Sequence, residues 1–109
     1  MTNLGQDVTV KETSVEQALV RLIKAQGGRA DKVQFVGKRG CPDRLVALAG
    51  RLWLVELKRP KGGRLSPQQI DLRRSYAALG IGVHVLCTVA EVEAFVAMVV
   101  ATKDTTMLI

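Results

Sequence analysis

The stretch from Gly40 to Lys58, GCPDRLVALAGRLWLVELK, most restricts what this chain can fold into. It has two short apolar segments on either side of Ala49-Gly50-Arg51, which is the pattern of a β-hairpin. Three charged residues, Asp43, Glu56 and Lys58, are set into these segments. Because an unpaired charge is costly to bury, the hairpin predicts a fold in which all three side chains have partners.

The turn gives the hairpin a predicted register. A two-residue turn at Gly50-Arg51 sets Leu45 opposite Glu56 and Asp43 opposite Lys58. Side chains two residues apart share a face, so Asp43, Glu56 and Lys58 point to the same side of the sheet. Asp43 and Glu56 become diagonal neighbours, about 5.5–8 Å apart, a separation that one metal ion can bridge. A slip of one residue would put the charges on opposite faces.

The second strand of the hairpin, Leu52 to Leu57, is apolar on both faces apart from Glu56. This pattern predicts a central strand that is covered on both sides. The alternative to a metal site is an ion pair of Lys58 with Glu56 or Asp43 at the rim of the sheet. Such a pair does not account for a second carboxylate that converges on the same spot.

The other elements predict an α/β fold with a mixed central sheet flanked by helices. The predicted order is helix, strand, hairpin, helix, strand, helix. The pattern predicts a helix over 14–26, a strand over 29–36, a helix that begins at Pro67, a strand over 83–87 and a last helix through about Thr102. At 109 residues the chain forms one domain, predicted over 14–103, with a flexible segment over 1–13 and a tail over 104–109.

Two more polar residues lie where they can join the hairpin charges. Glu16 falls at the edge of the apolar stripe of the first helix, although a glutamate there can also serve the helix N-terminus. Ser66, Pro67 and Gln69 are typical of a helix start, with Gln69 as the capping-box glutamine. Gln69 also shares the inward face of that helix with Tyr76, so both roles stay open.

The positive charge gathers around the hairpin. Residues 38–74 hold ten basic and three acidic residues, a net of +7, whereas the rest of the chain holds six basic and seven acidic residues, a net of −1. This concentration favours a polyanionic partner such as DNA over a merely solvated surface. The candidate DNA contacts are Lys38, Arg39, Arg44, Arg59, Lys61, Arg64 and Arg73.

Composition narrows the cellular setting. The N-terminus lacks the layout of a signal peptide, and no apolar run approaches the roughly 18 residues of a membrane span. We therefore expect a cytoplasmic protein that is not secreted and has no membrane partner. Cys41 and Cys87 are predicted to be free thiols, and a zinc site is not expected. The last helix is apolar on nearly every side, which predicts a subunit interface in a homodimer.

Two or three carboxylates, a lysine and basic surroundings suit metal-dependent phosphodiester hydrolysis. Oxygen ligands in this number favour Mg²⁺, with Mn²⁺ as a substitute. A bound metal lowers the pKa of a water ligand and stabilises negative charge in the transition state. Lys58 would orient that water or offset the developing charge.

Pro42-Asp43 followed by Glu56-Leu57-Lys58 is similar to the PD-(D/E)xK motif of restriction-endonuclease-like nucleases. The wider pattern resembles the small stand-alone, phage or bacterial type of the VRR-NUC (virus-type replication-repair nuclease) family. The residues that carry this resemblance are Gly40-Cys41-Pro42-Asp43, Glu56-Leu57-Lys58-Arg59-Pro60, Arg64-Leu65-Ser66-Pro67-Gln68-Gln69 and Gly80 before a valine-rich strand. The resemblance covers nearly the whole chain from Ser14. It implies a restriction-endonuclease-like core and, as the location, a bacterial or phage-infected host cytosol.

The resemblance implies roles for individual residues. Asp43, Glu56 and the backbone carbonyl of Leu57 would bind the metal, and Lys58 would be the catalytic lysine. A glutamate of the first helix maps to Glu16, with Glu12 as the competitor, and a catalytic glutamine maps to Gln69. The family implies a homodimer that cleaves branched DNA, as Holliday-junction resolvases do. The alternative function is a non-catalytic basic module that binds nucleic acid on the same fold.

Overall fold

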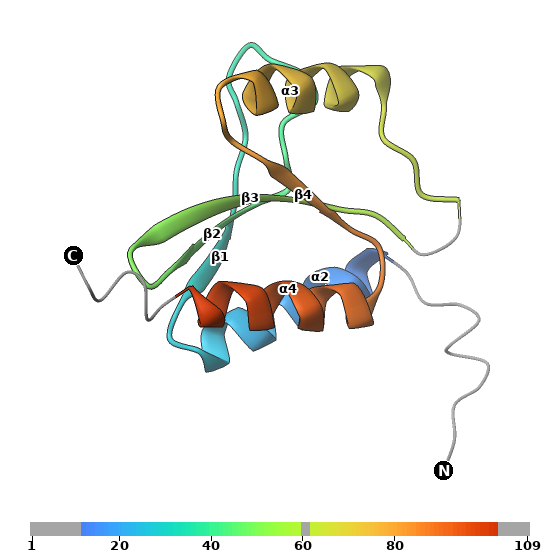
Figure 1. Ribbon diagram of the computed structural model, residues 1–109. Helices are drawn as coiled ribbons and strands as arrows, with labels where there is room; N and C mark the ends of the chain where they lie inside the picture. The colour runs from blue at the N-terminus through green and yellow to red at the C-terminus, as the bar shows by residue number, and fades with distance from the viewer. Residues whose placement is uncertain (1–11, 60–61, 103–109) are drawn as a thin grey trace.

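The computed structural model describes residues 12–59 and 62–102, which form a four-stranded sheet between two layers of helices (Figure 1). Helix α3 lies on one face of the sheet, and helices α2 and α4 lie side by side on the other. The elements are α2 (Glu12–Ala25), β1 (Arg29–Lys32), β2 (Arg44–Leu48), β3 (Arg51–Leu57), α3 (Pro67–Ala78), β4 (Val83–Leu86) and α4 (Val89–Ala101). The α/β class and the order of elements agree with the prediction.

The sheet is mixed, as predicted, with the strand order β1-β2-β3-β4. Strand β2 pairs antiparallel with β1 and with β3, whereas β4 pairs parallel with β3. Strand β3 therefore has a neighbour on each side, which confirms it as a central strand. The C-terminal end of β3 is its most buried part, since Val55, Glu56 and Leu57 are buried whereas Leu52, near its start, is 67 % exposed.

The predicted turn of the hairpin is wrong by one residue. The turn is formed by Ala49 and Gly50, whose φ angles of 56° and 78° are both left-handed, and Arg51 begins β3 opposite Leu48. Two consecutive left-handed residues give the type I′ geometry that matches the twist of a hairpin, and glycine tolerates this conformation best. Partners consequently shift by two residues along one strand. This even shift keeps every side chain on its predicted face.

The first helix begins at Glu12, two residues earlier than predicted. Strand β1 is shorter than predicted, because the chain leaves the sheet after Lys32 and rises toward α3 before it returns to β2 (Figure 1). Phe35 is consequently not a strand residue but lies beside Tyr76 of α3, with 6.1 Å between the ring centroids.

The hydrophobic core fills the space between the sheet and the pair α2 and α4. The largest fully buried side chains include Leu19 and Ile23 of α2, Leu57 of β3 and Val92 of α4. Helix α3, in contrast, contains no buried residue. The face of the sheet toward α3 is thus the one on which polar groups can gather.

The predicted terminal segments fall almost wholly on residues 1–11 and 103–109, outside the described part of the chain. Across 12–59 and 62–102, no helix is long and apolar enough to cross a membrane. Cys41 and Cys87 are free thiols.

Candidate active site

Glu56 is the centre of the candidate site. It is 2 % exposed, and it points from β3 toward α3 because Val55 and Leu57, its neighbours on the strand, belong to the core on the opposite face. One of its carboxylate oxygens, Oε2, lies 3.1 Å from Lys58 Nζ and accepts a hydrogen bond of 2.6 Å from Gln69 Nε2. Glu56 and Lys58 therefore share a face, as the alternation of the strand predicts.

Asp43 reaches the same place from the other strand of the hairpin. Continued by one residue, the pairing of Arg44 with Val55 sets Asp43 opposite Glu56. Asp43 Oδ2 accepts a hydrogen bond of 2.8 Å from the backbone N–H of Leu57. The two carboxylates are thus direct neighbours rather than the diagonal neighbours that the sequence predicts.

Gln69 performs both of the roles that its sequence position allows. Its side-chain oxygen accepts a 2.8 Å hydrogen bond from the Ser66 N–H, and its own backbone N–H donates to Ser66 Oγ, which completes the capping box. Its amide nitrogen meanwhile donates to Glu56. One side chain therefore fixes both the start of α3 and the position of the buried carboxylate.

The other carboxylate oxygen of Glu56, Oε1, is buried and has no hydrogen-bond partner among the described residues. Burial and the neighbouring Asp43 carboxylate together raise the pKa of Glu56 from its ordinary value of 4.5 to about 7, against the opposing effect of Lys58. A buried carboxylate with a free oxygen beside a second carboxylate fits a hard divalent cation, which would supply the missing partner.

Glu16 does not reach this pair. It lies on α2, against the opposite face of the sheet, where its Oε2 accepts a hydrogen bond of 2.9 Å from Arg44 Nε. Arg44 also donates from Nη1 to the Ala30 carbonyl at 2.8 Å. Arg44 points away from the side to which Asp43 points because successive strand residues alternate. The roles of Glu16 as a metal ligand and of Arg44 as a DNA contact stay predictions, and each requires the 2.9 Å ion pair to open.

Among residues 12–59 and 62–102, no group of three or more His, Cys, Asp and Glu side chains converges on one point. The donors at the site are instead the two carboxylates of Asp43 and Glu56, with the Leu57 carbonyl as the predicted third. Glu12, the competitor for the helix glutamate, lies in the first turn of α2.

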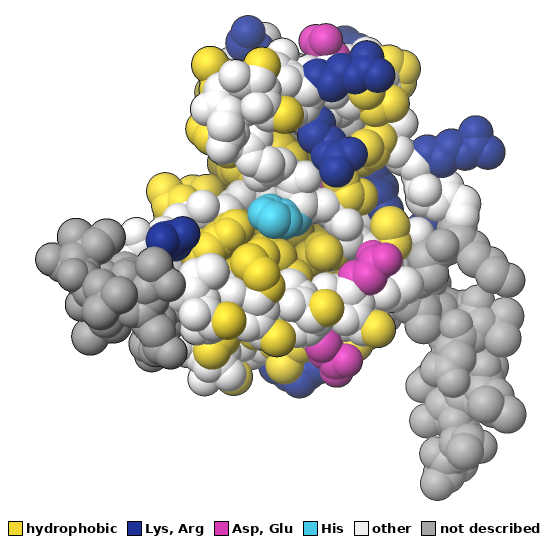
Figure 2. Space-filling view, viewed as in Figure 1, with side chains coloured by type: hydrophobic (Ala, Val, Ile, Leu, Met, Phe, Trp, Pro, Cys, Tyr) yellow, Lys and Arg dark blue, Asp and Glu magenta, His cyan; other side chains and the backbone are white. Residues whose placement is uncertain are grey.

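The predicted DNA contacts differ in how free their side chains are. Lys38, Arg39, Arg59 and Arg64 are exposed, and Arg73 is exposed with its Nε donating to the Val83 carbonyl at 3.2 Å. Arg44 is different, since its side chain is only 14 % exposed. Lys61 falls on residues 60–61, outside the described part of the chain. In Figure 2, many of the Lys and Arg side chains on the visible face gather over and beside α3.

Sequence reasoning missed the part that Gly40 has in the site. Gly40 has a φ of +85°, and a Cβ there would stand 2.4 Å from the Gln68 carbonyl oxygen and 2.8 Å from the Gln69 nitrogen. The segment that presents Asp43 therefore packs directly on the backbone that presents Gln69. The signal for this contact was the basic Gly37-Lys38-Arg39-Gly40 connection, whose second glycine permits a close approach that no other residue allows.

Comparison with known proteins agrees with this geometry. The chain is 42 % identical over 78 residues to "Putative nuclease p44" of Acyrthosiphon pisum secondary endosymbiont phage 1, a match that spans 71 % of this chain and 83 % of that protein. A solved structure described as "VRR_NUC domain" superposes with a TM-score of 0.73 and 28 % identity, over 79 % of this chain and 94 % of that one. No family model matches the sequence. The chain belongs to the VRR-NUC family of nucleases.

Proposed function

We propose that this protein is a Mg²⁺-dependent DNA endonuclease, with Mn²⁺ as a substitute, that hydrolyses phosphodiester bonds and prefers branched DNA. The observation that carries the proposal is the buried Glu56 carboxylate, which lies beside Asp43 and Lys58 and has a free Oε1. Glu56, Asp43 and the Leu57 carbonyl would hold the cation. When bound, the cation lowers the pKa of a water ligand and stabilises charge on the phosphoryl oxygens.

The chain's own residues prepare this site. The Leu57 N–H fixes one oxygen of Asp43 at 2.8 Å, which leaves the other oxygen for a cation. Gln69 holds Oε2 of Glu56, so that the free Oε1 keeps one orientation. Lys58 Nζ, with its side chain 18 % exposed, can reach both Glu56 and an incoming phosphate. Its positive charge would orient the attacking water and offset charge in the transition state.

DNA would approach on the α3 side of the sheet. Lys38, Arg39, Arg59 and Arg64 are exposed, and Arg73 adds a guanidinium that the Val83 carbonyl orients. Cations at several positions around the carboxylate pair would engage separate stretches of phosphate backbone. The preference for branched DNA, in replication, repair or recombination, follows from the resemblance to Holliday-junction resolvases.

A homodimer belongs to the same proposal. The outer side of α4 presents two exposed apolar residues, Ala97 and Met98, and the latter is 39 % exposed. Beside them a groove of about 430 Å³ between α2 and α4 is lined mainly by Leu22, Val96 and other small apolar residues. A second copy seated there would cover this apolar surface. Size-exclusion chromatography with light scattering tests this, and Ala97→Glu is expected to yield monomers.

Cleavage assays test the catalytic proposal. Duplex, flap, splayed-arm and four-way-junction DNAs are incubated with Mg²⁺, Mn²⁺ or EDTA, with Glu56→Ala and Lys58→Ala beside the wild type. Lys24→Ala and Asp31→Ala, which change exposed charges on α2 and β1, are the matched controls. We expect metal-dependent cleavage by the wild type and both controls, fastest on the branched substrates. Glu56→Ala should not cleave, and Lys58→Ala should cleave far more slowly than the wild type.

Two outcomes would contradict the proposal. Cleavage that persists in EDTA, or in both site variants, excludes the carboxylate pair as the catalytic centre. DNA binding by the wild type without cleavage of any substrate favours the alternative, a non-catalytic module that binds nucleic acid through its basic surface.

A further inference from the structure

We propose that a cavity between the 33–41 segment and α3 binds one unpaired DNA nucleotide next to the carboxylate pair. The cavity has a volume of about 530 Å³. Its lining combines the aromatic rings of Phe35 and Tyr76, the cations Lys38 and Arg39, and polar groups of Gln68 and Ser75. The inference rests on the proposed nuclease function and specifies which feature of the substrate the enzyme would bind.

The aromatic residues give the cavity a surface that suits a base. Phe35 and Tyr76 come from different segments, and their rings lie nearly parallel, with an interplanar angle of 17°. Neither ring is fully buried, so both are accessible from the cavity. Aromatic faces that line an open cavity are the usual platform for an unstacked base.

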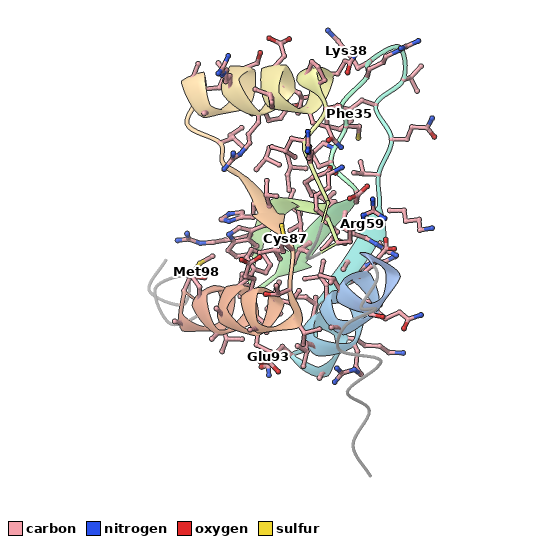
Figure 3. All side chains as sticks on the ribbon, turned by 90° about the vertical axis from the view of Figure 1, so that its right-hand side faces the viewer. Phe35, Lys38, Arg59, Cys87, Glu93 and Met98 are labelled. Atoms are coloured by element: carbon pink, nitrogen blue, oxygen red, sulfur yellow. The ribbon has the colours of Figure 1, made fainter. Side chains whose placement is uncertain are left out.

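The charged residues give the same cavity a place for phosphate. Lys38 and Arg39 are exposed, and neither forms an ion pair within the described part of the chain. Asp71 of α3 also lines the cavity. The charged groups around the cavity are therefore two cations and one carboxylate, a net charge of +1. Figure 3 shows Phe35 and Lys38 on the segment that rises beside α3. The combination of apolar faces and excess positive charge matches a nucleotide better than an apolar peptide or an acidic one.

The cavity adjoins the catalytic pair through the first turn of α3. Gln68 lines the cavity, while the next residue, Gln69, binds Glu56. Gly40 packs against the backbone of both glutamines, and Asp43 follows three residues later on the same segment. A strand whose scissile phosphate lies at Glu56 would thus bring a nearby nucleotide to the cavity. A base can enter only if it has left its duplex stack, so the cavity would select DNA with an unpaired nucleotide close to the cut.

Photocrosslinking tests the site without the need for cleavage. Two duplexes are compared that differ only in whether a single 5-iodouracil is paired or unpaired, in EDTA, and the crosslinked peptide is identified by mass spectrometry. We expect the unpaired base to crosslink to Tyr76 or Phe35 and the paired base to give little product. Crosslinks elsewhere in the chain, or equal yields from the two duplexes, would overturn the inference.

Variants of Tyr76 separate stacking from a structural role. Tyr76→Ala should weaken binding of the unpaired duplex by about 5- to 150-fold, the effect of losing one base–aromatic stack. Tyr76→Phe should keep the affinity, and so should Leu79→Ala, which removes an exposed apolar side chain just after α3, outside the cavity. Thermal unfolding followed by circular dichroism checks that each variant is folded. Equal affinity of Tyr76→Ala and the wild type for the unpaired duplex counts against the site.

Cleavage of the same duplexes distinguishes this inference from the proposed function. With Mg²⁺, the wild type should cut the unpaired duplex faster, and Tyr76→Ala should lose that preference while it still cuts. Cleavage of both duplexes at one rate, with no crosslink in the cavity, would leave the nuclease intact and overturn the nucleotide site. A crosslink in the cavity without any cleavage would support the nucleotide site and overturn the nuclease.

Discussion

Replacement of Glu56 by glutamine should remove from the metal-free protein the change of stability with pH, between about 4.5 and 7, that the Glu56 carboxyl causes. The unfolded chain releases the Glu56 proton near its ordinary pKa of 4.5, whereas the folded protein keeps it until about pH 7. Stability from this group is therefore fully present below pH 4.5 and is lost as the pH rises through 7. Glutamine carries no such proton and keeps the shape of the protonated glutamate.

The size of the effect follows from the pKa. A rise from 4.5 to about 7 corresponds to about 3 kcal/mol, at about 1.36 kcal/mol for each unit of pKa. The free energy of unfolding of the wild type, relative to that of Glu56→Gln, should thus fall by up to about 3 kcal/mol from pH 4.5 to pH 8. The ion pair with Lys58 exists only while Glu56 is ionised, so its effect is already contained in the pKa of about 7.

Urea unfolding in EDTA, followed by circular dichroism over this pH range, measures the difference. Addition of Mg²⁺ should flatten the wild-type curve, because a bound cation favours the ionised carboxylate, and should leave Glu56→Gln unchanged. Parallel curves for the two proteins in EDTA would refute the reasoning, since they would mean that the folded protein does not hold the proton of Glu56. A Mg²⁺ effect of equal size on both proteins would show that the cation binds elsewhere.

Three further predictions concern the surroundings of Glu56. Lys58→Ala should lower the cleavage rate by about 100- to 1,000-fold, the usual effect of removing one group that stabilises transition-state charge, while the melting temperature changes little. Gln69→Ala should destabilise the fold by about 1–3 kcal/mol in urea unfolding, because it removes partners from both Ser66 and Glu56. Ser66→Ala, which spares the bond to Glu56, should cost only about 1 kcal/mol and retain more activity, so equal losses of activity would contradict a direct role for Gln69. Gly40→Ala should lower the free energy of unfolding by at least about 1–2 kcal/mol, because alanine is strained at the left-handed φ of this position. It should also lose cleavage, because the added Cβ would displace the start of α3. Stability and cleavage equal to those of the wild type would show that the contact is dispensable.

The placement of Asp43, Glu56 and Lys58 on one face could be predicted from the sequence, although the register was wrong. The reason is that side-chain alternation has a period of two, so an error of two residues in pairing leaves the face unchanged. The start of α3 was predictable for a different reason. The bonds between Ser66 and Gln69 are local, and they depend on a spacing of three residues rather than on the rest of the fold.

The contact partner of Glu16, the glutamate of the first helix, was not predictable in the same way. The helical wheel places Glu16 at the edge of the apolar stripe, but it does not say which face of the sheet α2 will cover. The tertiary structure puts α2 under the face opposite Glu56, where Arg44 is the nearest cation. A residue's angle on its helix is a local quantity, whereas its partner depends on how the helix packs.

The sequence by itself determined which chemical groups this protein brings together. They are a carboxylate pair and a lysine on one face of the sheet, a capped helix, and a basic surface. Only the tertiary structure decided how these parts meet. It joins Gln69 to Glu56, turns Glu16 toward Arg44, and brings Phe35 against Tyr76, 41 positions away, where both line one cavity. Such contacts depend on chain segments that are distant in sequence, and the packing of layers, not local periodicity, brings those segments together.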